Sequence, residues 1–406
     1  MTAGGGLSVG GGVSAGGGVS AGAGVNRDLV ERVRSRLIVS GWRPTPARVA
    51  EALHDEGLVL GDGALIALVA ALQSEFTGAG PLEPFLADEL TTDILVNGPH
   101  AIWVERGQGL EQVSVQLADE DAVRRLAQRL ASLAGRRLDD ASPYVDARLP
   151  DGSRLHAIIP PVSPRGTCIS IRVPQRRVFT LADLVAAGSI PPAGATWLAR
   201  IIAGRLAFLV SGGTGAGKTT VLASLLTLVP AHERMVIVED SSELEPDHGH
   251  VVHLESRPPN VEGAGQVSLR DLVRQALRMR PDRVVVGEVR GGEVVDLLAA
   301  LNTGHEGGCG TVHANSAADV PARLEALALA AGLDRMALHA QVAAGLDAVI
   351  HVGRDPTGHR RVHEVCVLRP DEHRIVRAIP ALHFTARDVR EGPGLAWLQT
   401  RLDCPT

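Results

Sequence analysis

One short segment, Gly212-Gly213-Thr214-Gly215-Ala216-Gly217-Lys218-Thr219-Thr220, constrains the fold of this chain more than any other part of its sequence. It matches G-x-x-x-x-G-K-[ST], the pattern of a phosphate-binding loop. The glycines let successive backbone N–H groups point at phosphate oxygens, and the lysine reaches the β- and γ-phosphates. We call residues 212–220 the phosphate loop.

Lys218 is the only lysine of the chain, although lysine and arginine together number 40. A composition that otherwise uses arginine indicates that this position requires a compact ammonium, because a planar guanidinium does not fit the same slot. The lone lysine therefore favours a phosphate loop over a chance match. The same bias makes each arginine less informative.

The overall composition limits the classes of protein to consider. The 406 residues suffice for two or three domains, and 45% apolar with 21% charged residues is typical of a soluble globular protein. A net charge of −6 argues against broad nucleic-acid binding, so no stable nucleic-acid complex is expected. The four cysteines (Cys168, Cys309, Cys366, Cys404) form no C-x-x-C pair, which fits a reducing compartment and predicts no zinc site. With no apolar run near the ~20 residues of a membrane span and no secretory signal, we expect a cytoplasmic protein.

The composition and the spacing of apolar residues change along the chain. Residues 1–26 repeat Gly, Ala, Ser and Val, which predicts a flexible tail. Helical spacing over 27–79 predicts a small helical N-terminal region. Short alternating runs around one helix, Asp119–Leu133, predict an α+β domain over 80–173, and a proline-flanked stretch over 174–195 is interpreted as a linker.

Strands and helices alternate over 196–406, which predicts an α/β domain with a parallel sheet. The strands are expected at Leu206–Val210, Met235–Val238 and Val284–Gly287, and the helices at Lys218–Leu228, Leu269–Met279 and Glu293–Leu301. The phosphate loop follows the first strand, at the carboxyl edge where such sheets bind ligands.

Acidic residues end two of the predicted strands. Glu239 and Asp240 follow one strand, and Glu288 follows the other. A nucleotide hydrolase needs one acid that holds Mg²⁺ through water and one that orients or deprotonates the attacking water. Thr219 would ligate the Mg²⁺ directly. An ordinary acidic start of a helix explains each acid alone, but two such ends beyond a phosphate loop favour catalysis.

A glycine-rich stretch from Thr303 to Asn315 carries two histidines, His305 and His313. With Cys309 they are spaced as metal ligands on a helix, but the intervening glycines disfavour a helix. We therefore expect γ-phosphate sensing or subunit coupling rather than a metal site.

Three arginines, Arg148, Arg154 and Arg172, come from the α+β region, which has no phosphate loop of its own. In a ring of subunits they could reach the γ-phosphate of a neighbour as arginine fingers. Ordinary surface arginines remain the alternative.

Four motifs then follow in order: Gly212–Thr220; Val238-Glu239-Asp240 with Glu243-Leu244; Arg278–Arg283 running into Gly287–Arg290; and Thr303-Gly304-His305 with Thr311–Asn315. They resemble the Walker A, Asp box, Walker B and His box of the type II/type IV secretion ATPase superfamily. The chain most resembles its tight-adherence (Tad) pilus assembly and conjugal-transfer-associated members. The resemblance runs from Gly80 to His351, with Gly80–Pro84, Leu95–Gly98 and Asp146–Arg154 extending it through the α+β region.

The resemblance implies a RecA-like P-loop ATPase domain preceded by a PAS-like α+β domain and a helical N-terminal region. It also implies a homohexamer that binds ATP and Mg²⁺ between its domains. Such a ring drives pilus assembly or secretion through a polytopic platform protein, on the inner face of the cell membrane.

The resemblance also implies roles for single residues. These are phosphate and Mg²⁺ binding for Lys218 and Thr219, water activation for Glu239, the Walker B acid for Glu288, coupling for His305 and His313, and phosphate contacts for Arg154 and Arg172. The chain departs from the family at Gly308-Cys309-Gly310, where a small-Leu-Ser type of stretch is usual. The cysteine-rich metal module of some relatives is absent from the sequence, so no zinc is expected.

Two alternatives to a pilus motor stay open. A conjugation-type or type IV secretion ATPase shares these motifs, but a DNA motor should carry a basic or aromatic channel, and aromatics are only 2% of the residues. A scaffold ring without hydrolysis is the other, and the intact Lys218, Thr219, Glu239 and Glu288 argue against it.

Overall fold

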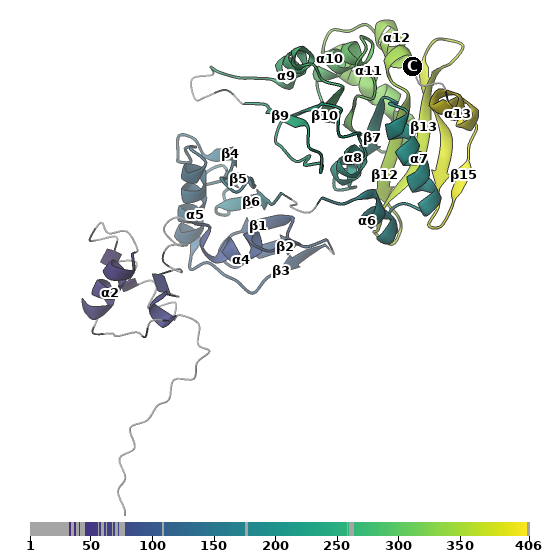
Figure 1. Cartoon of the computed structure of the whole chain (residues 1–406). Helices are drawn as coiled ribbons and strands as arrows, with labels where there is room; N and C mark the ends of the chain where they lie inside the picture. Colours follow the sequence, from purple (N-terminus) through teal and green to yellow (C-terminus); the bar gives the residue numbers. More distant parts are fainter. Residues whose placement is uncertain are drawn as a thin grey trace, which may run out of the picture. The chain divides into compact units, whose positions relative to one another are not determined.

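The computed structural model divides the chain into two compact units, Met1–Pro174 and Gln175–Thr406. It describes residues 32–33, 36–37, 40, 45–55, 57, 61, 63–66, 68–69, 72, 78–107, 109–174, 178–257, 259 and 264–403. The predicted flexible tail, residues 1–26, lies outside the described residues. Figure 1 shows the elements of each unit.

The first unit begins with helical segments. Helix α2 (Pro46–Asp55) starts at a proline, which suits the first turn because the N–H that proline lacks is unpaired there anyway. Its buried residues Val49, Ala52 and Leu53 pack with Val33 and others in a small apolar cluster. Two short helices follow, η1 (Gly80–Leu82) and α4 (Glu83–Leu86).

A six-stranded antiparallel sheet forms the rest of the first unit, in the order β3-β2-β1-β6-β5-β4. Its strands are β1 (Asp93–Asn97), β2 (Ile102–Glu105), β3 (Leu110–Gln112), β4 (Tyr144–Arg148), β5 (Arg154–Ile158) and β6 (Cys168–Arg172). Helix α5 (Glu120–Leu133) buries Val123, Leu126 and Leu130 in the core of this unit. Its predicted start holds, because the Asp119 side chain accepts a hydrogen bond of 2.7 Å from the Ala122 N–H.

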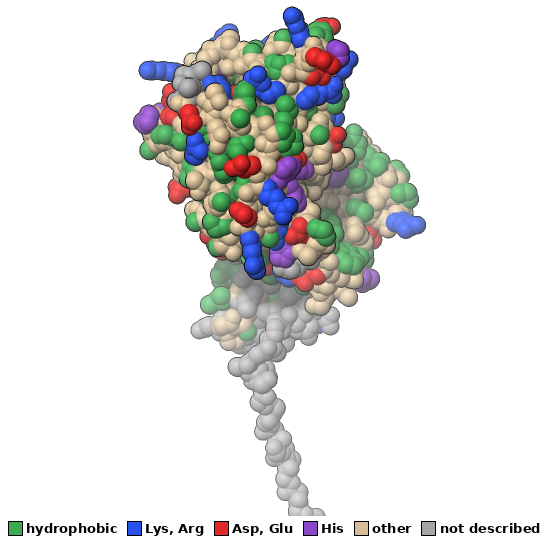
Figure 2. Space-filling view, turned by 90° about the vertical axis from the view of Figure 1, so that its right-hand side faces the viewer, with side chains coloured by type: hydrophobic (Ala, Val, Ile, Leu, Met, Phe, Trp, Pro, Cys, Tyr) green, Lys and Arg blue, Asp and Glu red, His purple; other side chains and the backbone are tan. Residues whose placement is uncertain are grey.

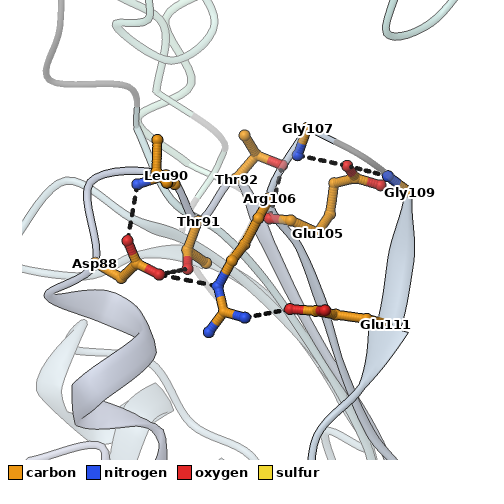
Figure 3. A network of polar contacts seen from close by, with 9 residues as sticks. All are labelled: Asp88, Leu90, Thr91, Thr92, Glu105, Arg106, Gly107, Gly109 and Glu111. Atoms are coloured by element: carbon orange, nitrogen blue, oxygen red, sulfur yellow. Dashed lines mark hydrogen bonds and ion pairs between the residues drawn. The ribbon is translucent and has the colours of Figure 1, made fainter.

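Polar contacts shape the turn between β2 and β3 (Figure 3). The Arg106 Nε donates to Asp88 at 2.9 Å, and the same guanidinium pairs with Glu111. Glu105 accepts hydrogen bonds from the N–H groups of Gly107 (2.7 Å) and Gly109 (2.9 Å). These polar partners hold the turn, and the Arg106 guanidinium also lies over the Phe85 ring, 5.6 Å from its centroid.

The stretch that we interpreted as a linker contains a helix. Helix α6 (Leu181–Ala186) starts at a capping box in which Thr180 and Asp183 bond each other's backbone N–H groups. Leu184 and Ile190 are buried in the core of the second unit. The flanking prolines suggested a linker, but the cap and these two apolar residues attach the stretch to that unit.

The second unit is built on a nine-stranded sheet in the order β15-β14-β13-β12-β7-β11-β10-β8-β9. The six strands from β12 to β9 are parallel, as predicted, whereas β13, β14 and β15 are antiparallel additions. The parallel strands are β7 (Phe208–Gly212), β8 (Met235–Glu239), β9 (Val251–Glu255), β10 (Arg283–Val289), β11 (Cys309–His313) and β12 (Ala348–Arg354). The antiparallel strands are β13 (Arg360–Pro370), β14 (Val376–Phe384) and β15 (Val389–Glu391).

Helices cover both faces of this sheet. Along β7 the side chains alternate, so that Phe208 and Val210 join one core and Leu209 joins the other. The first core is shared with α6, α7 (Pro192–Ala203), α8 (Lys218–Leu226) and α13 (Leu395–Asp403). The second is shared with α9 (Leu269–Ala276), α10 (Glu293–Leu301), α11 (Val320–Ala330) and α12 (Arg335–Gly345). Two single turns, η2 (Leu277–Met279) and η3 (Ala317–Asp319), complete the unit.

Within the described part of the chain, no helix is both long enough and apolar enough to cross a membrane.

Candidate active site

The phosphate loop connects β7 to α8 in the second unit, and glycines shape both of its ends. Gly217 precedes α8 with a φ of 96°, in the left-handed region that favours glycine. A Cβ on Gly212 would lie 2.3 Å from the carbonyl oxygen of Val352 on β12. Only a residue without a side chain permits this close approach between loop and strand.

Lys218 is the first residue of α8 and is only 8% exposed. Its ammonium donates back to the carbonyl oxygens of Gly212 (3.2 Å) and Gly213 (3.0 Å). Burial lowers the pKa of this lysine, while the charges of Glu288 and Glu243 act in the opposite direction. Thr219 and Thr220 follow in the first turn of α8, both half-buried.

His313 and Glu288 lie beside Lys218. Strand β11 runs between β7 and β10, and its register places His313 opposite Gly212. The His313 Nε2 is 2.6 Å from the Glu288 Oε1, and both ring nitrogens lie 3.4 Å from the Lys218 Nζ. The fold therefore gathers an acid, a histidine and the lysine at one point of the sheet edge.

Glu239 ends β8 at the same carboxyl edge and is 5% exposed. Its carboxylate accepts hydrogen bonds from the N–H groups of Glu243 (3.2 Å) and Leu244 (3.1 Å). Burial raises the pKa of Glu239 to about 8, against the opposing effect of these two bonds. A carboxyl that titrates near neutral pH suits a general base. The neighbouring Asp240 pairs with Arg290.

Thr219 and Glu288 are the candidate ligands of Mg²⁺. Mg²⁺ keeps several waters and is usually held by one or two carboxylates together with substrate phosphates. Among the described residues, no group of three or more His, Cys, Asp or Glu side chains could hold a metal ion. One hydroxyl on α8 and one acid on β10 therefore fit an ion that arrives with a nucleotide better than a resident metal.

His305 lies away from this group. Strand β11 begins at Cys309 and runs toward the phosphate loop, so His305 precedes the opposite end of the strand. Five residues of strand separate the two ends by roughly 13 Å. The ring of His305 contacts the carbonyl oxygen of Ala300 at 3.2 Å. The two histidines of the glycine-rich stretch thus have different surroundings.

Three arginines of the first unit stand in one row across its sheet. The register pairs Arg148 with Arg154 on β5 and Arg154 with Arg172 on β6, and Asp93 lies opposite Arg172 on β1. Arg154 bonds Asp146 at 2.9 Å, and Arg172 lies 3.4 Å from Asp93. This arginine row places three guanidinium groups on one face of the sheet, with aspartates beside two of them.

Sequence reasoning missed a contact that holds the strand before the loop. The Ser211 hydroxyl lies 2.9 Å from the His351 Nδ1, which joins β7 to β12. Burial lowers the pKa of His351, so the neutral ring is favoured. A single histidine inside the apolar run 348–352 was the available signal, and it belongs to no motif.

Residues 75–365 match the protein family described as "Type II/IV secretion system protein". A Mycobacterium tuberculosis (strain CDC 1551 / Oshkosh) protein, named for conjugal transfer, is 57% identical over 331 residues, which cover 80% of this chain and 94% of that protein. The conjugal transfer protein TrbB of Rhizobium radiobacter is 33% identical over 288 residues, covering 69% of this chain and 84% of that protein.

A solved structure shares the fold. The crystal structure of the pilus retraction motor PilT with bound ADP matches with a TM-score of 0.51 at 22% identity, covering 72% of this chain and 84% of that one. At this identity the likeness bears on the α/β fold alone. The family match covers most of the chain. The alignment with the mycobacterial relative covers 80% of this chain and 94% of that protein. The chain therefore belongs to the type II/IV secretion system protein family.

Proposed function

We propose that this chain is a motor ATPase, which hydrolyses ATP and converts the energy into domain movement for pilus assembly or protein secretion. One observation carries the proposal: at one sheet edge the His313 ring lies 3.4 Å from the Lys218 Nζ and 2.6 Å from the Glu288 Oε1, so the histidine stands between the lysine and the acid. The buried Glu239 ends the strand beside β10 at that edge.

In the proposed reaction, Lys218 exchanges its bonds to the loop carbonyls for the β- and γ-phosphates of ATP. Thr219 and, through water, Glu288 would hold Mg²⁺, which neutralises charge that develops on the phosphate oxygens. Glu239 would accept a proton from the attacking water. His313, between the lysine and Glu288, would respond to the presence of the γ-phosphate.

The proposed assembly is a homohexameric ring. Arg154 and Arg172 of the arginine row would contact phosphates, and His305 would link the nucleotide state to domain motion. The partner would be a polytopic platform protein of the inner membrane, with the ring on its cytoplasmic face. Support comes from the resemblance to the tight-adherence pilus ATPases and from the cationic row on a unit whose sequence lacks a phosphate loop.

A conjugation-type ATPase is the second candidate. The relatives at 57% and 33% identity both carry names from conjugal transfer, which favours this alternative. The net charge of −6 and the scarcity of aromatic residues disfavour direct contact with DNA. We therefore rank the pilus or protein-secretion motor first.

The decisive experiment measures phosphate release by the purified chain with ATP and Mg²⁺. Wild type should turn over ATP, and Lys218→Ala should abolish turnover while the chain remains folded by circular dichroism. Retained turnover in Lys218→Ala would remove the phosphate loop from the mechanism. Rings that mix Arg172→Ala with Lys218→Ala subunits should regain partial activity if the arginine acts on a neighbour, and no recovery argues against action in trans.

The two candidate functions are separated by what stimulates turnover. Vesicles that contain the platform protein should accelerate a pilus or secretion motor. Stimulation by single-stranded DNA at physiological salt, with none by those vesicles, would favour the conjugation-type motor.

A further inference from the structure

The hairpin of β12 and β13 lies against the phosphate loop within the second unit. Ser211, the residue before the loop, bonds His351 on β12. Gly212, the first residue of the loop, approaches the Val352 carbonyl so closely that a Cβ would lie 2.3 Å from its oxygen. The strand that supports the start of the loop therefore continues directly into this hairpin.

The same hairpin also reaches the other end of the loop. A Cβ on Gly217 would lie 3.5 Å from the Cδ of Arg360, the first residue of β13. Gly217 is the residue before Lys218 and the N-cap of α8. The aliphatic stem of Arg360 thus passes the start of α8. This is where the backbone N–H groups of such a loop receive phosphate.

The turn of the hairpin is rich in arginine. The register places Arg354 directly opposite Arg360, and like charges so placed repel each other. Between them the sequence holds one acid, Asp355, which is engaged by Arg361 at 2.8 Å. Arg354 donates to the Gly358 carbonyl at 3.0 Å. Figure 2 views the chain from the side on which Figure 1 shows β13 and β15, and blue and purple side chains lie there with red acidic ones among them.

We propose that Arg360 is a nucleotide-binding residue that acts in the same chain as the phosphate loop and contacts the α- and β-phosphates. This inference rests on the proposed function. The position beside Gly217 favours the α/β end of the nucleotide, because the loop amides there cradle the α- and β-phosphates while lysine reaches onward to the γ-phosphate. Arg360 should therefore bind ADP and ATP alike. Such uniform binding changes KM and leaves kcat unaltered.

The test compares wild type, Arg360→Ala and Arg360→Lys for binding of fluorescently labelled ADP and ATP and for steady-state hydrolysis. Arg360→Ala should bind both nucleotides about tenfold more weakly and raise KM by a similar factor, with kcat unchanged, as expected for one charge-assisted contact. Arg360→Lys should recover part of the affinity. The matched control is Arg377→Ala on β14, an exposed arginine that bonds Asp371 at 2.9 Å in the neighbouring hairpin.

Three results would overturn the inference. Unchanged affinity in Arg360→Ala removes the residue from the site. A loss for ATP alone, together with a lower kcat, places it at the γ-phosphate instead. An equal loss in Arg377→Ala shows a general effect of surface charge. Thermal unfolding without nucleotide checks the fold of each variant, and if Arg360→Ala is destabilised the comparison uses Arg360→Gln. Wild type that binds neither nucleotide would refute the proposed function itself.

Discussion

Two charged clusters occupy opposite edges of the nine-stranded sheet, and they differ in how their charges are balanced. At the carboxyl edge stand Lys218, Glu288 and His313, with the buried Glu239 nearby. At the amino edge, Arg283 is 1% exposed and donates to Glu233 at 2.7 Å, while Arg205 reaches the other carboxylate oxygen at 2.9 Å.

In the amino-edge cluster the charged groups pair with one another within the protein. Each oxygen of Glu233 has an arginine, and Arg283 also donates to the carbonyl oxygen of Ile202 at 3.0 Å. Glu239, in contrast, has two backbone N–H donors, and burial raises its pKa to about 8. Balanced buried charge serves stability, whereas a buried acid without a cationic partner is available for proton transfer.

The largest expected effect comes from Glu239→Gln. The amide keeps the size of the side chain and the backbone contacts but cannot accept a proton, so turnover should fall by about 10²–10⁴-fold. The free energy of unfolding at neutral pH should not decrease. Phosphate release and urea unfolding measure the two quantities. Near-normal turnover would show that another group activates the water.

Glu233→Ala should have the opposite profile. It leaves two arginines without their carboxylate, one of them fully buried, and should lower the free energy of unfolding by about 3–5 kcal/mol. Urea unfolding measures this loss. Nucleotide affinity of the folded protein should stay at the wild-type value, because the cluster lies at the far edge. A selective loss of affinity, with stability intact, would contradict the division between the two edges.

The pH dependence of stability should distinguish Glu239→Gln from wild type. The folded state holds the proton of Glu239 up to about pH 8, whereas the unfolded chain releases it near pH 4.5. Folded protein therefore binds more protons in this window, and stability falls as pH rises through it. Glu239→Gln lacks this dependence. It should be more stable than wild type above pH 8, by on the order of a few kcal/mol, and similar below pH 4.5.

The pH dependence of kcat/KM tests independently whether Glu239 accepts the proton. The kcat/KM of wild type should rise with pH toward a plateau above about pH 8, as Glu239 in the free enzyme becomes ionised. A flat profile between pH 6 and 9 would show that this carboxyl is not the base.

The smallest expected effect is that of Gly287→Ala. A Cβ there would lie 2.4 Å from the Glu239 Cγ, so the substitution should displace that side chain and cost about 1–3 kcal/mol of stability. Turnover should fall together with stability. Gly307→Ala is the corresponding change at the other edge, where a Cβ would lie 2.9 Å from the Arg283 Nη1 and the φ of 72° adds backbone strain. It should lower stability while sparing turnover per folded molecule.

Local sequence patterns predicted which strands and helices surround the site better than they predicted the residues at which these elements begin and end. Strand β7 was expected to stop at Val210, because Ser211 and Gly212 are typical of a loop, yet pairing with β11 and β12 carries the strand through them. Glu288 was expected after a strand but lies inside β10. The membership of the secretion family is confirmed. The roles of Glu239, Glu288, the arginines and the histidines stay predictions.

The antiparallel strands β13 to β15 could not be derived from the motifs. The four motifs end at Asn315, before these strands begin, and hairpins of this kind carry no chemical signature; the resemblance was expected to fade beyond His351, but the family match continues to residue 365. Their consequence is large, because β13 pairs with β12 and brings Arg360 to the phosphate loop.

The sequence by itself determined the phosphate loop and the family, because the loop's chemistry depends on consecutive residues and on backbone conformations that glycine permits. Only the tertiary structure determined which side chains lie beside Lys218. His313 is 95 positions away along the chain, and Ser211 and His351 are separated by 140. Such contacts follow from the order of strands in a sheet buried on both faces, and that order depends on packing over the whole unit rather than on any local pattern.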